Sequence, residues 1–347
     1  MECPPLRPFA ALLAASIAMA PAVANAASGS GGEPRLRSGW RDDYRRPLAV
    51  PYPADNPYSA AKAALGAALF FDPVLSGSRS TACVTCHQPS LAWGDSLARA
   101  IGDRQWPMAL RSPTLLDAAW IPLLGWDGRF PDVESVTLQA ILSEENMDLP
   151  AHEAVERLSA SPAYVRRFHA AFGPGLITTG QVQQALATYE RGIRSAPAPF
   201  DRWVDGDERA VGEAAKRGFA LFEGRAGCSG CHVGWAFTNY SFQDIGSASG
   251  GDIGRGALFP SSVSLRYAFK VPTLRDVALR APFMHNGSIA TLASVIELYD
   301  RGGIDRPSRS PQIQPLGLTT AEKAELIDFL ATLTGDPQQV VPAPSPR

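Results

Sequence analysis

The sequence predicts a mainly α-helical protein built from two related halves. Helical periodicity recurs along the chain, whereas the alternation typical of strands is scarce. The pentad Cys-x-x-Cys-His occurs twice, at residues 83–87 and 228–232. Similar segments precede the two pentads, AAKAALGAALFF at 60–71 and GEAAKRGFALFE at 212–223. We therefore expect one structural module to be repeated, with one pentad in each copy.

The first 26 residues are typical of a secretory signal. Arg7 precedes an apolar run at 9–20, and Ala-Asn-Ala at 24–26 supplies a small-residue cleavage site. The run is too short and alanine-rich for a membrane span. We predict export to the periplasm with cleavage, which would remove Cys3 and leave four cysteines. An uncleaved anchor is the alternative.

The rest of the chain divides into four predicted parts. The predicted order is an extended segment at 27–57, an N-terminal domain at 58–205, a C-terminal domain at 206–335 and a proline-rich tail at 336–347. The chain of 347 residues is long enough for two domains with real cores. Its formal charge of -2 argues against nucleic acid as a partner, and no later segment resembles a membrane span.

Helix signals appear in order along these parts. Ser59 suits an N-cap, and Leu65 and Leu69 share one face of the helix that follows. Residues 151–195 carry two more helical patterns, separated at 172–175 by Phe-Gly-Pro-Gly.

The last helical segment lies at 319–335. Thr319 and Glu322 are spaced as a capping box, and Gly335 stands where a C-cap is expected. Its apolar residues recur with helical spacing at Leu326, Phe329, Leu330 and Leu333.

The pentads indicate c-type haem. Two thiols at i and i+3 can add to the two vinyl groups of one haem, and the adjacent histidine then lies beneath the iron. A thioredoxin-like motif needs no such histidine, zinc would draw both pentads into one site, and disulfides would not choose this spacing twice. We predict two covalently bound haems, held by Cys83, Cys86 and His87 and by Cys228, Cys231 and His232.

The order of motifs between residues 55 and 335 resembles the bacterial diheme cytochrome c peroxidase and MauG family. Besides the pentads, the matching stretches are LFFDPVLS (69–76), RSPTLLDAA (111–119), WDGRF (126–130), VPTLRDVALRAPFMHNGS (271–288) and ELYDRGG (297–303). The resemblance implies two cytochrome c-like domains. It also implies a peroxide-reacting N-terminal haem and an electron-transferring C-terminal haem.

Trp126 matches the tryptophan that lies between the two haems in this family. An indole there can relay oxidising equivalents between them, so that both haems store the two equivalents from one peroxide. A tryptophan that merely packs in the core is the alternative.

In many of these peroxidases a histidine caps the resting N-terminal iron, and this sequence lacks it. No histidine lies between 88 and 151, and the matching position is Asp103. We expect Asp103 to face solvent or an arginine. The N-terminal iron is then open at rest, with Met108 the first alternative ligand.

A distal acid is expected near the peroxide site. The family's glutamate position falls on Asn146, so Glu144 or Glu145 could take the role, with Gln139 as a second polar candidate. A solvated charge run is the alternative.

The interhaem calcium of the family is doubtful in this chain. Its asparagine position falls on Arg111 and a nearby threonine position on Arg280. Two guanidinium groups would repel a cation, so we predict that an arginine head occupies the calcium position.

Tyr299 is the predicted sixth ligand of the C-terminal haem. We expect a helix from an N-cap at Ser288 to the glycines at 302–303, with one apolar face containing Leu292, Val295, Ile296 and Tyr299. By resemblance, Tyr299 matches a methionine ligand in many peroxidases and a tyrosine ligand in MauG. His285 matches a residue near the haem that is not a ligand, and Met284 is expected to pack.

Two functions follow from these features. One is reduction of hydrogen peroxide with electrons from a small periplasmic cytochrome c or cupredoxin. The other is MauG-like, peroxide-dependent oxidation of residues in a partner protein. A plain electron-transfer cytochrome is a third alternative, against which the open iron argues.

Overall fold

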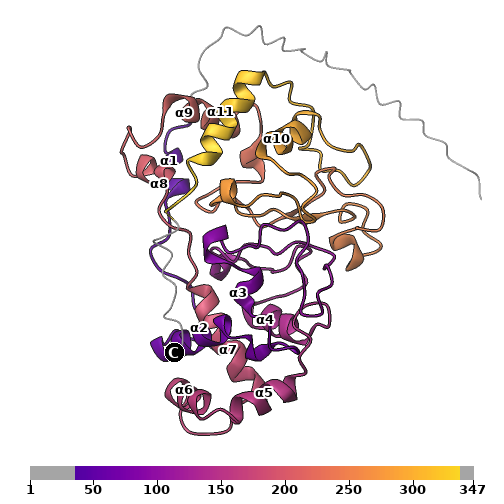
Figure 1. The fold of residues 1–347 in the computed structure, drawn as a ribbon. Coiled ribbons are helices and arrows are strands. Elements are labelled where there is room, and N and C mark those ends of the chain that lie inside the picture. The colour runs from indigo at the N-terminus through magenta and orange to yellow at the C-terminus, as the bar shows by residue number, and fades with distance from the viewer. Residues whose placement is uncertain (1–35, 337–347) are drawn as a thin grey trace, which may run out of the picture. The chain divides into compact units, whose positions relative to one another are not determined.

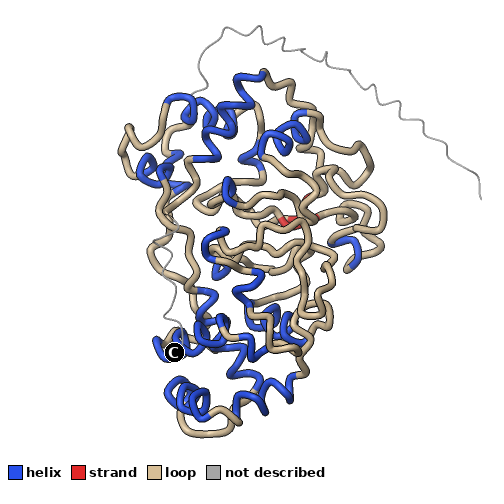
Figure 2. Tube along the Cα trace, in the orientation of Figure 1, coloured by secondary structure: helices blue, strands red, loops and turns tan. Residues whose placement is uncertain are grey.

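The computed structural model describes residues 36–336. The predicted signal at 1–26 and nearly all of the predicted tail lie outside this range. Helices dominate the described residues, as predicted, and Figure 2 shows long loops between them. Among residues 36–336, no helix combines the length and apolar character needed to cross a bilayer.

The helices and strands follow one another through both halves (Figure 1). The α-helices are α1 (Trp40–Tyr44), α2 (Ala60–Phe71), α3 (Cys83–Cys86), α4 (Val133–Leu142), α5 (Ala151–Ser159), α6 (Pro162–Phe172), α7 (Thr179–Arg191), α8 (Pro199–Val204), α9 (Glu213–Glu223), α10 (Leu292–Asp300) and α11 (Thr320–Ala331). Short 3-10 turns are η1 (Pro73–Leu75), η2 (Pro89–Leu91), η3 (Ala118–Trp120), η4 (Cys228–Gly230), η5 (Arg255–Ala257) and η6 (Val277–Leu279). Strands β1 (Phe242–Gln243) and β2 (Phe269–Lys270) pair antiparallel, with Phe242 opposite Lys270.

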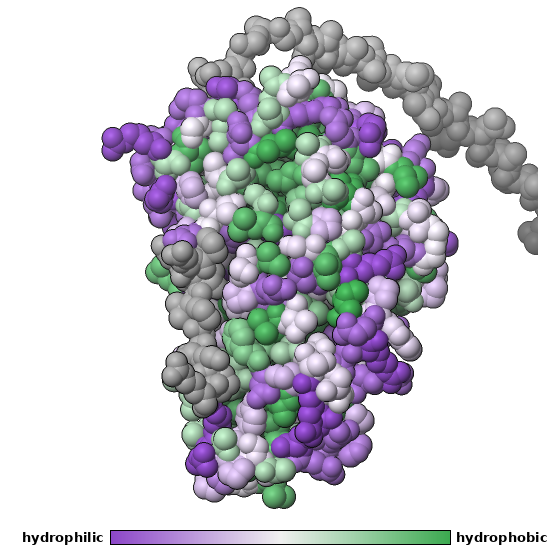
Figure 3. Space-filling view, in the orientation of Figure 1, coloured by the Kyte–Doolittle hydropathy of each residue, from purple (hydrophilic) through white to green (hydrophobic). Residues whose placement is uncertain are grey.

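Two large hydrophobic cores organise most of these elements, and a small third cluster contains Leu124, Val133 and Ala187. The first runs from Leu65 to Ile193, and the second combines residues from Phe200 onward with Trp40 and Tyr44. Helix α8, which the predicted boundary at 205 assigned to the N-terminal half, therefore packs with the second core. Apolar side chains of α10 and α11 are visible at the surface in Figure 3, beside the cavity described below.

Each core is built on one close helix pair. In the first, a Cβ added to Gly66 of α2 would lie 2.0 Å from the Ala185 carbonyl oxygen of α7. In the second, a Cβ added to Gly218 of α9 would lie 1.9 Å from the Glu325 carbonyl oxygen of α11. Both distances are far inside van der Waals contact, so each pair needs its glycine for this approach.

The N-terminal segment departs from the extended conformation expected for it. Its helix α1 inserts two aromatic rings into the second core, with Trp40 4.6 Å from Trp203 and Tyr44 5.0 Å from Phe237 between ring centroids. Burial of these rings fixes the segment, although it is separated in sequence from that core by the whole first half.

Several helix ends lie where the sequence predicts them, and others do not. Ser59 Oγ accepts from the Lys62 amide at 3.1 Å, and Thr319 with Glu322 forms the predicted capping box. Helix α10 instead begins after Thr291, whose hydroxyl caps it, so the prediction of Ser288 was wrong.

Helix α11 ends earlier than predicted. Its C-cap is Thr332, and Gly335 packs against Ala196 instead. The first of the two helical patterns within 151–195 is split into α5 and α6, because Ser161 caps a new helix whose first residue is Pro162.

Candidate haem-binding sites

The first pentad forms a single helical turn with its histidine held from behind. In α3 the His87 amide donates to the Cys83 carbonyl at 3.0 Å. His87 Nδ1 lies 3.2 Å from the Trp93 carbonyl, which can only accept, so Nδ1 carries the proton and Nε2 is free to bind an iron. Burial lowers the pKa of His87, which favours the neutral ring that a metal requires.

The second pentad repeats this arrangement. The His232 amide donates to the Cys228 carbonyl at 2.9 Å, and Nδ1 lies 2.9 Å from the Phe237 carbonyl. Burial lowers the pKa of His232 to about 4. The two pentads therefore present the same free Nε2 atom in both halves.

The cysteines of the pentads are neutral thiols in two separate places. Cys83 packs against the first core and Cys228 against the second. Burial raises the pKa of Cys86 to about 11 and that of Cys228 to about 12. Within residues 36–336, no three His, Cys, Asp or Glu side chains gather as a metal site. The placement argues against one shared zinc ion.

A large cavity in the C-terminal half contains the second pentad and Tyr299. Cys228, Cys231 and His232 lie on its wall together with Tyr299. Its apolar lining includes Phe222, Val277, Leu292, Ile296, Leu326 and Leu330. The predicted apolar face of α10 is thus confirmed, and the tyrosine shares one space with the histidine.

Buried Arg111 and half-buried Arg280 line the same cavity, and neither side chain forms an ion pair with a carboxylate among residues 36–336. Arg111 Nη1 donates to the Arg280 carbonyl at 3.0 Å, but the Nε atoms of both side chains have no partner among the described residues. Burial lowers the pKa of Arg111, and it lowers that of Arg280 to about 10. Lys270 also reaches this cavity, where burial lowers its pKa to about 8. Apolar walls with three cationic side chains among them fit a haem, whose propionates are anionic.

Trp126 lies where the two halves meet. Its Nε1 donates to the Arg111 carbonyl at 3.0 Å, and its ring stands edge-on to His285 with centroids 6.4 Å apart. His285 Nε2 pairs with Asp252 at 2.6 Å, and its ring stacks on Phe269 at 3.6 Å. These contacts engage Nε2 and one ring face of His285, and its position near the haem without ligation stays a prediction.

The two halves can be aligned residue by residue around this contact. A bridge joins Leu124 to Phe130 in the first half, and an equivalent bridge joins Phe283 to Ile289 in the second. This alignment makes Trp126 the counterpart of His285.

The alignment extends into helices α4 and α10. Asp132 caps α4 and Thr291 caps α10, each through the amide three residues on. Tyr299 lies eight residues beyond its cap, and the residue eight beyond Asp132 is Ala140. The N-terminal half therefore has a methyl group where the C-terminal half has a phenol.

The prediction that Asp103 faces solvent or an arginine was wrong. Asp103 is buried, and its carboxylate accepts from the amide and hydroxyl of Ser78 at 2.8 and 2.6 Å. Its own amide donates to the Asn146 carbonyl at 2.6 Å. Asp103 thus holds two loops together.

The three predicted distal candidates do not converge in a buried pocket. Glu144, Glu145 and Gln139 are all exposed. Glu144 lies 3.5 Å from Arg104 in a surface ion pair. Besides Asp103, a second buried carboxyl near this region is Glu190 of α7, which sequence reasoning missed. The sequence feature that could have indicated this buried carboxyl is the position of Glu190 on a helix, next to mostly apolar residues.

Comparison with known proteins agrees with this geometry. Residues 60–209 match the sequence profile of the di-haem cytochrome c peroxidase family. The chain is 46% identical over 299 residues to the methylamine utilization protein MauG of Methylorubrum extorquens, covering 86% of this chain and 85% of that protein. It is 32% identical to the cytochrome c551 peroxidase of Nitrosomonas europaea, covering 82% and 84%.

A solved structure shares the fold. It is the crystal structure of a MauG-like protein associated with microbial copper homeostasis, with a TM-score of 0.78, 28% identity and coverage of 84% of this chain and 95% of that one. The chain therefore belongs to the bacterial di-haem cytochrome c peroxidase and MauG family.

Proposed function

We propose that this enzyme is a periplasmic di-haem c-type oxidoreductase that reduces hydrogen peroxide with electrons from a small redox protein, a cytochrome c or a cupredoxin. Peroxide would react in the N-terminal half, and Trp126 would relay oxidising equivalents between the two haem sites. The observation that carries the proposal is the repeated pentad with a neutral histidine and a free Nε2 in each half. In this proposal each half is one cytochrome c-like domain.

The haems supply the redox chemistry when bound. The chain's part is to hold and orient them: Cys83 and Cys86 would form the thioether links in the first half, and Cys228 and Cys231 those in the second. The carbonyls that accept from the histidine Nδ1 atoms fix each ring and increase the basicity of Nε2.

The two halves differ in the residue that would lie opposite the histidine if a haem were bound. Ala140 carries no ligating atom, which supports an N-terminal site open to peroxide. Tyr299 is the proposed sixth ligand in the C-terminal half, and its cavity position supports this role. A phenolate is anionic, so it lowers the potential of the second site and stabilises its oxidised forms.

Trp126 is proposed as the relay between the halves. Its indole N–H is fixed by the Arg111 carbonyl, and its edge-on packing against His285 holds the ring plane. A fixed ring needs little rearrangement when it gains or loses an electron.

Arg111 and Arg280 are proposed to supply the positive charge that calcium supplies in other family members. Their partly unpaired guanidinium groups already place two cations beside the cavity. A divalent ion there would be repelled at short range.

MauG-like oxidation of a partner protein is the second candidate. The 46% identity to a MauG protein and the tyrosine at 299 favour it. A plain electron-transfer cytochrome has less support, because Ala140 leaves the N-terminal half without a second ligand.

The test is to add hydrogen peroxide to the holoenzyme with and without reduced cytochrome c, following donor oxidation and the haem spectrum. A peroxidase should oxidise two donor molecules per peroxide, because reduction to two waters consumes two electrons and two protons. A long-lived spectral change without donor oxidation would favour the MauG-like function. No change in either signal would reject both.

A further inference from the structure

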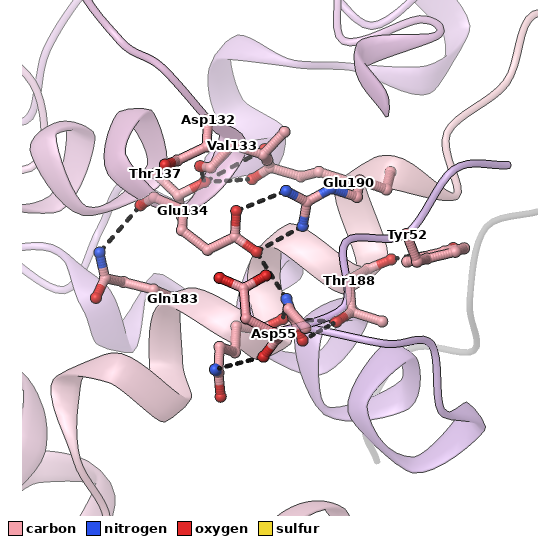
Figure 4. A network of polar contacts seen from close by, with 12 residues as sticks. Tyr52, Asp55, Asp132, Val133, Glu134, Thr137, Gln183, Thr188 and Glu190 are labelled. Carbon is pink, nitrogen blue, oxygen red and sulfur yellow. Dashed lines mark hydrogen bonds and ion pairs between the residues drawn. The ribbon is translucent and has the colours of Figure 1, made fainter. Parts of the chain in front are cut away.

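Glu190 of α7 is a buried carboxyl with no ion-pair partner among the described residues. It is 7% exposed, and within residues 36–336 its carboxyl group has one hydrogen-bonding neighbour, Thr137 of α4, whose Oγ1 lies 3.4 Å from both carboxyl oxygens (Figure 4). The adjacent Arg191 does not neutralise it, because Glu134 takes that guanidinium at 2.5 and 2.6 Å. A carboxyl this isolated is costly to bury in its charged form.

The C-terminal half shows that the fold does not need this carboxyl. The space beside Gly66 is closed by Ala185 and Tyr189, and the space beside Gly218 is closed by Glu325 and Phe329. Helices α7 and α11 therefore correspond. Glu190 follows Tyr189 in α7, and Leu330 follows Phe329 in α11, so these two residues are equivalent.

The partner of Glu190 has an apolar counterpart as well. Thr137 lies five residues beyond the cap of α4, and Ile296 lies five beyond the cap of α10. The C-terminal half thus has the buried apolar pair Ile296 and Leu330. The N-terminal half has the buried polar pair Thr137 and Glu190 at the equivalent positions. Since the apolar version packs in the same framework, the polar pair has a chemical role.

The correspondence also places the pair. Ile296 and Leu330 line the cavity that contains the second pentad. From the correspondence of the halves, we infer that Thr137 and Glu190 face the equivalent position beside the first pentad. In agreement, the Glu190 charge raises the pKa of the Cys83 thiol, after the larger effect of burial. Thr137 also precedes Ala140 by three residues, which puts both on one face of α4.

The hydrogen bonds show which group carries the proton. Thr137 Oγ1 lies 2.7 Å from the Val133 carbonyl, which can only accept, so the hydroxyl proton points there. Its lone pairs are then free to accept from a protonated Glu190. Burial raises the pKa of Glu190 to about 8, with Thr137 and Arg191 opposing and Glu134 adding to the rise. The other titratable groups facing it are Cys83 and Tyr189.

We propose that Glu190 and Thr137 form the proton-exchanging pair of the N-terminal haem cavity. Glu190 stores one proton as a neutral carboxyl and releases it through the Thr137 hydroxyl, which turns from Val133 toward the cavity and passes on its own proton. One O–H bond breaks at Glu190 and one forms on the acceptor oxygen, and solvent then restores the carboxyl. The pair thus supplies protons for peroxide reduction in place of the exposed Glu144 and Glu145. This inference rests on the proposed open N-terminal haem.

The test is the rate of cyanide binding to the ferric holoenzyme between pH 5 and 10. Hydrogen cyanide must lose its proton on binding, so the rate reports proton exchange in the cavity without any peroxide. We expect the wild-type rate to change around pH 8 as Glu190 ionises, and Glu190→Gln to lose this inflection and to bind about 10²-fold more slowly above it. Glu190→Gln should also lose an infrared band of a protonated carboxyl that titrates near pH 8.

Thr137→Ser and Thr137→Val are the matched controls, because only the second removes the hydroxyl. Thr137→Ser should keep the inflection and Thr137→Val should lose it, and this comparison decides the question if Glu190→Gln does not accumulate. If the inflection around pH 8 persists in Thr137→Val or Glu190→Gln, the proposal is overturned. Failure of the wild-type protein to bind cyanide would also overturn it. If the cyanide profile holds but peroxide is not reduced, the proposed function fails and the proton-exchanging pair stands.

Discussion

Replacing Glu190 with glutamine should stabilise the protein increasingly as the pH rises. Glutamine keeps the shape of the neutral carboxyl but cannot ionise. Glu190 has a pKa of about 8 in the folded protein and an ordinary value of 4.5. Between these two values the folded state binds more protons than the unfolded state, so its free energy of unfolding falls as the pH rises.

The size of the effect follows from the same two values. At pH 5 the cost of Glu190 is about 1 kcal/mol, and at pH 7 it is about 3 kcal/mol. The difference in unfolding free energy between Glu190→Gln and wild type should therefore grow by about 2 kcal/mol between pH 5 and 7. It should level off above the folded-state pKa.

Guanidinium unfolding of both holoproteins, followed by circular dichroism at several pH values, measures this difference directly. The slope with pH is the informative quantity, because loss of the Thr137 contact would shift all values equally. A difference that stays constant from pH 5 to 9 would show that Glu190 is already ionised in the native protein and would refute the reasoning.

Four further predictions concern the two halves. Ala140→Tyr places a phenol opposite the first histidine, so the N-terminal haem should become low-spin by electron paramagnetic resonance and stop reacting with peroxide; a persistent high-spin signal would contradict the alignment. Tyr299→Phe should change the low-spin haem spectrum and raise the potential of that haem, and an unchanged spectrum would exclude Tyr299 as a ligand. Metal analysis after mild chelation should find no tightly bound calcium on which activity depends, because we propose that the guanidinium groups of Arg111 and Arg280 supply the charge at that position. Gly218→Ala forces a methyl group into the backbone of α11 and should destabilise the second core by about 2 kcal/mol or more in thermal unfolding; an unchanged midpoint would show that the helices can move apart.

Local patterns in the sequence were sufficient for the features that depend on near neighbours. The pentads, the Ser59 cap and the Thr319 capping box each involve residues within one or two helical turns, and the structure shows the corresponding contacts. The apolar face of α10 was also predictable, because helical spacing alone sets which side chains share a face.

Features that depend on distant contacts were not accessible in this way. The rings of α1 enter the second core, and Asp103 is buried against Ser78 although its sequence neighbours are polar. Both outcomes follow from which segments meet in space, and no local pattern specifies that.

The sequence by itself determined the chemistry that each half can perform, since two thiols and a histidine on one turn have few other uses. Only the tertiary structure decided how the halves differ. In the structure, Ala140 is the counterpart of Tyr299. The pair Thr137 and Glu190 is the counterpart of the pair Ile296 and Leu330. The physical reason is that these comparisons join residues from separate helices, whose equivalence appears only when α4 packs on α7 and α10 packs near α11.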